Sequence, residues 1–154
     1  MTYRIRGLAP EPFRSLFRMN DAELRDHRAV RLTASGSGEP CRVSLREAAA
    51  GEQLILVNHV SLDADTPYRA SHAIYVREDA REASLFEDAL PPILDGRRIS
   101  LRAFDAEGML IDGLVVEPGQ GDRAVRDLFE RSAVAEIHAH TSAYGCFLAR
   151  IQRN

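Results

Sequence analysis

Short apolar runs, several of them alternating with polar residues, recur along the chain and predict strands. In Ser71–Arg77 the alternation places His72, Ile74 and Val76 on one face. The continuous run Leu54–Val57 is too short for a buried helix and rich in branched side chains, which favours a core strand. We expect strands at Thr2–Gly7, Val30–Thr33, Gln53–His59, Ser71–Arg77, Arg98–Phe104, Met109–Val116, Ala135–His140 and Cys146–Ile151.

Two pairs of these segments are separated by short turn sequences and predict β-hairpins. Asp105–Gly108 joins the first pair and ends in a glycine that can take a left-handed conformation. Thr141–Gly145 joins the second pair near the end of the chain.

Helical spacing of apolar residues is confined to short segments. Pro10 precedes an i, i+3, i+4 stripe of phenylalanine and leucine, and Asn20 precedes a capping pattern that predicts a helix to about Arg28. Asp122 is expected to cap a helix whose stripe is Val125, Leu128 and Phe129. Weaker signals predict a helical turn from Ser44–Glu47 to Gly51, and a helix of Leu85, Phe86, Ala89 and Leu90 ended by Pro91 and Pro92.

These elements are mixed rather than strictly alternating, so the fold class is α+β. We expect a mixed or mainly antiparallel sheet of six to eight strands with three or four short helices. The length of 154 residues suits a single domain over residues 1–154.

Composition removes several classes of function. All 20 basic residues are arginine, which excludes lysine Schiff bases and a Walker-type phosphate lysine. The net charge of −3 argues against nucleic-acid binding, and no apolar run approaches the length of a membrane span. Charges in the first residues argue against a secretory signal, so we expect a cytoplasmic protein with two free cysteines, Cys41 and Cys146.

Glu136, His138 and His140 alternate along one predicted strand and therefore share a face. Two imidazoles in this spacing can bind zinc or a similar divalent metal, with Glu136 or Cys146 as a third ligand. The alternative is a pair of hydrogen-bonded or solvated histidines on an outward face.

Cys41 precedes Arg42, and a guanidinium beside a thiol can activate it as a nucleophile. Cys146 is the other candidate thiol, and His72 can act as the base only if the fold brings it close. The alternative is that Cys41 is a buried small apolar residue and His72 a histidine at the edge of the core.

Loops rich in hydroxyl groups carry Arg42, Arg46 and Arg69, and such arginines bind carboxylates and phosphates. Together with Ser71 and His138 they suggest a site for a small anionic metabolite. The alternative is a structural role, with Arg69 paired to Asp63 or Asp65.

Several segments carry a resemblance to a known family, namely Pro40–Leu45, Pro67–Ser71, Ile74–Arg77, His138–His140 and Gly145–Phe147. In these segments the chain resembles a bacterial family of unknown function, domain of unknown function 1203. The resemblance runs from Tyr3 to Arg150 and implies a single stand-alone domain, without an activity or catalytic residues to carry over. Relatives often have glycine in place of His72 and asparagine in place of Thr141, which weakens a catalytic role for His72 and a polar site just after His140.

Three hypotheses remain open. The first, which we favour, is a module that binds an anionic metabolite through Arg42, Arg69, Ser71 and His138. The second is a thiol- or metal-dependent enzyme using Cys41 or Cys146, or His138 and His140. The third is an interaction domain without a pocket, such as a homodimer joined through a strand edge.

Overall fold

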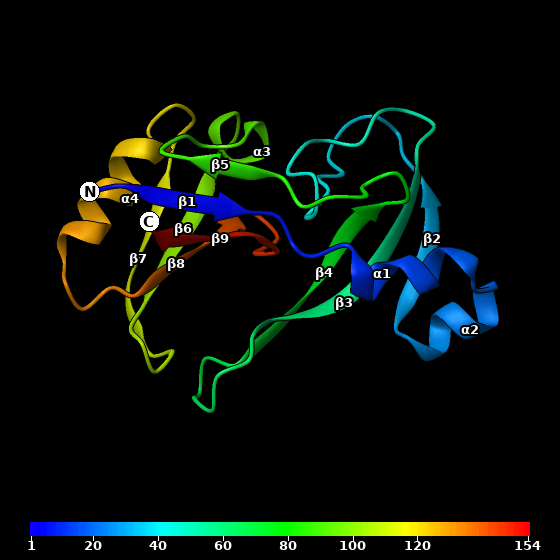
Figure 1. The fold of residues 1–154 in the computed structure, drawn as a ribbon, viewed down its shortest axis with the longest axis horizontal. Coiled ribbons are helices and arrows are strands. Elements are labelled where there is room, and N and C mark those ends of the chain that lie inside the picture. Colours follow the sequence, from blue (N-terminus) through cyan, green and yellow to red (C-terminus); the bar gives the residue numbers. More distant parts are fainter.

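The computed structural model describes residues 1–154 and contains two antiparallel sheets that form two lobes (Figure 1). The large sheet has the strand order β5-β1-β9-β8-β6-β7. Its strands are β1 (Tyr3–Arg6), β5 (Leu85–Glu87), β6 (Ile99–Phe104), β7 (Leu110–Val116), β8 (Glu136–Thr141) and β9 (Phe147–Arg153). The small sheet has the order β2-β3-β4, with strands β2 (Ala29–Thr33), β3 (Gln53–Leu62) and β4 (Ala70–Arg77).

The helices are short, and each lobe has its own. The small sheet is accompanied by α1 (Glu11–Arg14), the 3-10 helix η1 (Ser15–Arg18) and α2 (Asp21–Asp26), whereas α3 (Pro92–Asp95) and α4 (Gly121–Glu130) belong to the large sheet (Figure 1). None of them is long and apolar enough to span a membrane. The α+β class is therefore confirmed, with nine strands divided between two sheets.

Each sheet buries one apolar face under its helices. Val125, Leu128 and Phe129 of α4, the stripe predicted from sequence, pack with Leu101 and Ile137 in a core of 18 residues. A separate core of 11 residues joins the small sheet to α1, η1 and α2. The opposite face of the large sheet is turned toward β3 and β4, and this face carries the histidines of β8.

Both predicted hairpins are confirmed, as β6–β7 and β8–β9. The capping box of α2 is also present, since the Asn20 side chain accepts from Glu23 N and the Glu23 carboxylate accepts from Asn20 N. The cap of α4 differs from expectation. Gln120 occupies the N-cap position, while Asp122 lies in the first turn and accepts a hydrogen bond from another element.

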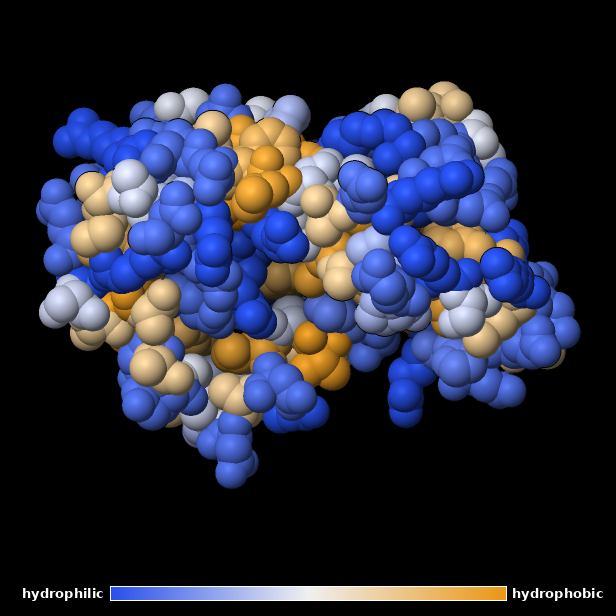
Figure 2. Space-filling model, in the orientation of Figure 1, coloured by the Kyte–Doolittle hydropathy of each residue, from blue (hydrophilic) through white to orange (hydrophobic).

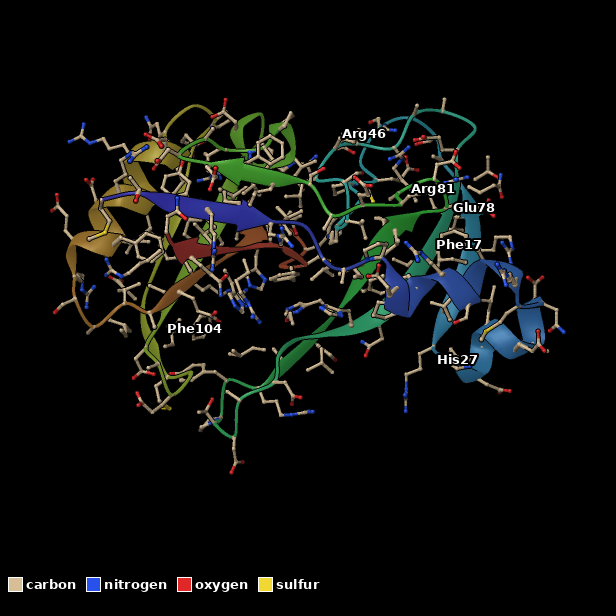
Figure 3. The ribbon with its side chains drawn as sticks, viewed as in Figure 1. Phe17, His27, Arg46, Glu78, Arg81 and Phe104 are labelled. Atoms are coloured by element: carbon tan, nitrogen blue, oxygen red, sulfur yellow. The ribbon has the colours of Figure 1, made fainter.

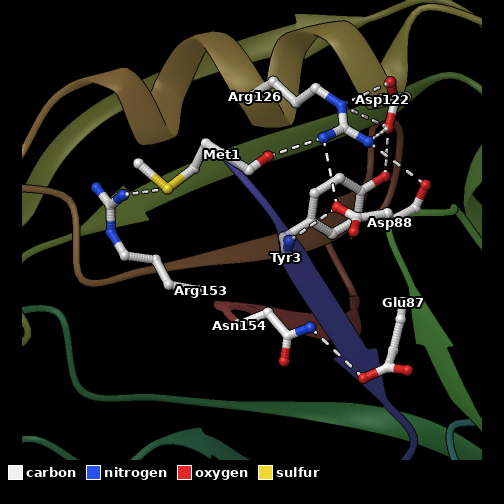
Figure 4. Close-up of polar contacts among 8 residues, drawn as sticks. All are labelled: Met1, Tyr3, Glu87, Asp88, Asp122, Arg126, Arg153 and Asn154. Carbon is white, nitrogen blue, oxygen red and sulfur yellow. Dashed lines mark hydrogen bonds and ion pairs between the residues drawn. The ribbon is translucent and has the colours of Figure 1, made fainter.

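That hydrogen bond comes from Tyr3, whose buried hydroxyl lies 2.6 Å from Asp122 Oδ1 (Figure 4). Arg126 binds the same carboxylate at 3.0 Å and also binds Asp88. The guanidinium of Arg126, and then the Tyr3 hydroxyl, lower the pKa of Asp122. Burial, followed by Asp122, raises the pKa of Tyr3. This cluster ties β1 and the segment after β5 to the start of α4.

Two predicted helices are wrong. Residues 44–51 form turns and an isolated bridge between Pro40 and Glu47, and Leu45 has a positive φ of 51° that a helix does not allow. Leu85–Glu87 forms β5, because β1 leaves an edge with which this segment pairs. In both cases contacts with distant segments override a weak local pattern.

Candidate functional site

A cavity of about 740 Å³ lies between the two lobes, and we call it the intersheet cavity. Figure 2 shows a hollow along the junction of the lobes, with apolar residues gathered beside it. Leu56, Ala73 and Tyr75 line it from the small sheet, and the β8–β9 turn contributes Tyr144 and Cys146. The remaining lining residues are Gly38, Pro40, Arg42, Glu47, Pro92, Gly96, Arg97, Arg98, Thr141, Ser142 and Ala143.

Arg42 is the most deeply buried charged group in this lining, with 2% of its surface exposed. Its Nε donates to the carbonyl of Phe147 at 2.7 Å, and Nη1 donates to the carbonyl of Pro40. No carboxylate pairs with it. Burial lowers the pKa of Arg42 to about 10, so the guanidinium stays charged at pH 7 without a neutralising partner.

The other two arginines of the intersheet cavity are already paired. Arg97 forms an ion pair with Glu47, and Arg98 Nε lies 2.8 Å from Glu117 Oε1. The cavity therefore has one buried positive charge free to meet an anion, and that charge belongs to Arg42.

The two cysteines lie in different surroundings. Cys41 is completely buried, and its Sγ lies 3.4 Å from the backbone nitrogen of Arg77. Cys146 is half-buried and lines the intersheet cavity with Arg42. A completely buried thiol has no access to a substrate, so this placement favours the structural alternative for Cys41 and leaves Cys146 as the accessible thiol.

We expect iodoacetamide to modify Cys146 in the native protein and Cys41 only after unfolding. The reason is access, because Cys41 is enclosed in the core of the small-sheet lobe. Peptide mass spectrometry of the native and the urea-unfolded protein measures the two rates separately. Equal native rates at both cysteines would contradict the burial of Cys41.

The strand face predicted for Glu136, His138 and His140 is present in β8, but it is covered rather than outward. His138 Nε2 lies 2.9 Å from Glu136 Oε1, and both histidines are buried against β3, β4 and Phe147. Burial raises the pKa of Glu136, but the hydrogen bond with His138 and the charge of Arg150 outweigh it and lower the pKa overall. The sequence predicted the shared face, and packing of the second sheet accounts for its burial.

The structure has no group of three or more His, Cys, Asp or Glu side chains arranged to hold a metal ion. His138 and His140 lie together, with ring centroids 6.3 Å apart, and the Glu136 carboxylate binds His138. A zinc site on Glu136, His138 and His140 stays a prediction that this arrangement does not favour.

His72 lies with the β8 histidines and makes no hydrogen bond with either cysteine. Its ring centroid is 5.0 Å from that of His140, and its Nδ1 is 2.8 Å from Ser61 Oγ. Burial, followed by the charge of Arg102, lowers the pKa of His72. His72 is therefore placed to interact with Ser61.

The remaining predicted ligand residues lie outside the intersheet cavity. Arg69 Nη2 pairs with Asp63 Oδ1 at 2.9 Å on the exposed β3–β4 loop, as the structural alternative expected. Ser71 is exposed and accepts from Asn58. Arg46 pairs with Glu52 on the small-sheet lobe, where Figure 3 labels it. Of the predicted ligand residues, Arg42 alone lines this cavity.

Sequence reasoning missed Tyr75, Arg97 and Tyr144 as parts of this site. Tyr144 carried a usable signal, because an aromatic residue in a hairpin turn is exposed, and 92% of its surface is accessible here. Nothing in the sequence marked Arg97, because its ion pair with Glu47 depends on how the two lobes pack.

Comparisons with known proteins identify the chain at the level of a family. No curated protein and no solved structure matches it. One family model matches residues 38–153, which includes every residue of the intersheet cavity. The chain therefore belongs to the family described as Protein of unknown function (DUF1203).

Proposed function

We propose that this protein binds a small anionic molecule with an apolar body in the intersheet cavity. The observation that carries the proposal is the buried Arg42, which lines this cavity and whose guanidinium has only carbonyl partners. A buried charge without a counter-charge is unfavourable, and a bound anion relieves it. The planar fork of arginine also suits a carboxylate or phosphate group.

The apolar part of the ligand follows from the rest of the lining. Leu56, Ala73, Pro92 and the ring of Tyr75 surround the space beside Arg42, whose guanidinium carbon is 6.0 Å from the Tyr75 ring centre. A volume near 740 Å³ lies within the range of small-molecule sites. An aryl or alkyl carboxylate meets both requirements.

The experiment compares phenylacetate with phenylacetamide, which differ in charge and share the apolar body. We expect the acid to bind at least tenfold more tightly by isothermal titration calorimetry, and to raise the melting temperature more. In Arg42→Met this preference for the acid should disappear. Equal binding of acid and amide by the wild-type protein would refute the proposal.

Arg42 also donates hydrogen bonds to two backbone carbonyls, so replacing it changes the structure as well as the site. A second variant therefore tests the site while Arg42 is kept. Ala73→Phe places an aromatic ring in the cavity from an exposed position of β4 and should weaken binding of phenylacetate at least tenfold. The matched control is Val30→Phe, on the exposed edge strand β2 and outside the cavity, which should bind as the wild type does. If Ala73→Phe folds and binds normally, the anion lies elsewhere.

A thiol-dependent enzyme is the second candidate, because Cys146 lines the same cavity as Arg42. Protection of Cys146 from iodoacetamide by bound phenylacetate would locate the ligand beside the thiol. The homodimer stays a prediction. Of the four edge strands, β2 and β7 carry the exposed apolar side chains Val30 and Val115, which suits them to it.

A further inference from the structure

A row of apolar side chains on the small sheet begins in the intersheet cavity and continues beyond it to the edge strand β2. Tyr75 of β4 is paired with Leu56 of β3, and Leu56 is paired with Val30 of β2. Residues directly opposite each other on neighbouring antiparallel strands share one face of the sheet. These three side chains therefore cross the sheet in one line, which we call the apolar strip.

The apolar strip is open along its length. Tyr75 and Leu56 line the intersheet cavity and are half-buried, and 46% of Val30 is exposed. A single exposed valine is ordinary, but an exposed apolar surface that continues the wall of a cavity is typical of a ligand-binding groove. The strip therefore extends the intersheet cavity toward solvent.

The neighbouring residues of β3 on this face confine the strip to one row. Leu54, two residues before Leu56, is completely buried in a small core of its own. Asn58, two residues after Leu56, is exposed and polar. An apolar chain that leaves the cavity across β3 is therefore directed over Leu56 toward Val30.

Arg42 supplies a charged group at the cavity end of the strip. Its guanidinium carbon lies 6.0 Å from the centre of the Tyr75 ring. Nε and Nη1 donate to backbone carbonyls, whereas Nη2 has no partner in the protein. Among residues that are not exposed, the only buried side-chain nitrogens and oxygens without a hydrogen-bond partner belong to Glu47 and His140, so Nη2 of Arg42 is accessible. An anionic group in the cavity can bind Nη2 without displacing either carbonyl.

The length of the path from Arg42 to Val30 sets the length of the ligand. Two strand-to-strand steps separate Tyr75 from Val30, and each step is about 4.8 Å. Together with the 6.0 Å from the guanidinium to the Tyr75 ring, the path is roughly 15 Å long. This is about half of the ~30 Å hydrocarbon thickness of a bilayer, which two acyl chains fill end to end.

We infer that the ligand of the intersheet cavity is an unbranched fatty acid, with its carboxylate on Arg42 and its alkyl chain along the apolar strip. The inference rests on the proposed function and adds the class of ligand. A single negative charge suits the site, because Arg97 and Arg98 are already paired with glutamates. An unbranched chain suits a strip that is one residue wide, and each methylene that it buries tightens binding by up to about fourfold.

The probes are hexanoate, which is too short to reach Val30, and dodecanoate, which reaches it. In Val30→Gln we expect dodecanoate to bind at least fivefold more weakly than in the wild type by isothermal titration calorimetry, because its last methylenes lose an apolar contact. Binding of hexanoate and of phenylacetate should not change. The matched control is Val115→Gln, at an exposed position of the edge strand β7, which should bind all three acids as the wild type does.

Nuclear Overhauser effects in the wild-type protein locate the alkyl chain without a substitution. The terminal methyl group of dodecanoate should lie near the methyl groups of Val30 and not near those of Val115. Absence of the contact with Val30, or unchanged binding of dodecanoate by Val30→Gln, would overturn the inference. If phenylacetate still binds in that case, the proposed function stands, whereas a failure of all three acids to bind would refute both.

A second copy of the chain is the competing occupant of the strip, because β2 is an edge strand that another β2 can pair with. Sedimentation velocity of the wild type and of Val30→Gln decides between the two. A monomeric wild type leaves Val30 free for the alkyl chain, as the inference requires. A wild-type dimer that dissociates in Val30→Gln would show that a second copy covers the strip and would overturn the inference.

Discussion

Gly7→Ala should lower the free energy of unfolding by about 4 kcal/mol, at the upper end of what single substitutions cost. Gly7 lies where the chain leaves β1 and passes toward the small sheet, hydrogen-bonded to the carbonyl of Ser84. A Cβ at this position would overlap the carbonyl oxygen of Val43 and lie 2.8 Å from its carbonyl carbon. Backbone atoms cannot rotate away as a side chain can, so the segments that contain Gly7 and Val43 would have to move apart.

Urea unfolding of Gly7→Ala and Gly113→Ala tests this expectation. A Cβ on Gly113 would lie 3.7 Å from the carbonyl oxygen of Leu101, an ordinary contact, so this control should change stability by less than about 1 kcal/mol. Similar losses in the two variants would show that the close approach at Gly7 does not limit stability.

Glu52→Ala should destabilise the protein by about 3 kcal/mol at pH 7. The two oxygens of Glu52 accept from Arg77 Nε at 2.8 Å and from Nη2 at 2.5 Å. Arg77 is buried, and without Glu52 its guanidinium retains only the hydroxyl of Ser44, at 3.2 Å. The matched control is Glu78→Ala, the exposed neighbour labelled in Figure 3, which should change stability by less than about 0.5 kcal/mol.

The effect of Glu52 should depend on pH in a defined direction. Hydrogen bonds from Arg77, followed by those from Ala49 and Arg46, lower the pKa of Glu52 from 4.5 to about 2. A carboxyl group with a lowered pKa in the folded state stabilises the protein fully above its unfolded pKa and loses that contribution as the pH falls. The stability difference between wild type and Glu52→Ala should therefore be constant near neutrality and shrink from pH 4.5 toward pH 2. A difference that stays constant down to pH 2 would contradict the charge-based origin of the effect.

The sequence predicts local elements well where the spacing of apolar residues and the residue types in the turns indicate the same structure. The hairpin of β8 and β9 and the apolar stripe of α4 are determined by neighbouring residues, and both are confirmed. The division into two sheets depends on which strands pair. Because β1 lies between β5 and β9, that pairing joins segments from both ends of the chain, and no local pattern contains it.

The candidate sites follow the same rule. Arg42 could be predicted as a candidate because the residues beside it in its loop are visible in the sequence. The cavity that it lines could not, because residues from both lobes form it. His138 and His140 could be placed on one face by the period of a strand. Arg102 could not be joined to them, because the pairing of β6 with β8 links segments that are distant in sequence and have no turn between them.

The position of β1 between β5 and β9 also bears on how the molecule is made. The strands and loops of the small sheet are contiguous in sequence, so this lobe can form while translation continues. The partner of Tyr3 in β9 is Arg153, which leaves the ribosome on the order of ten seconds later at ordinary rates of synthesis. During that interval β1 has an unpaired edge, and the wall that the β8–β9 turn gives to the intersheet cavity is absent. The intersheet cavity is therefore complete only in the finished protein.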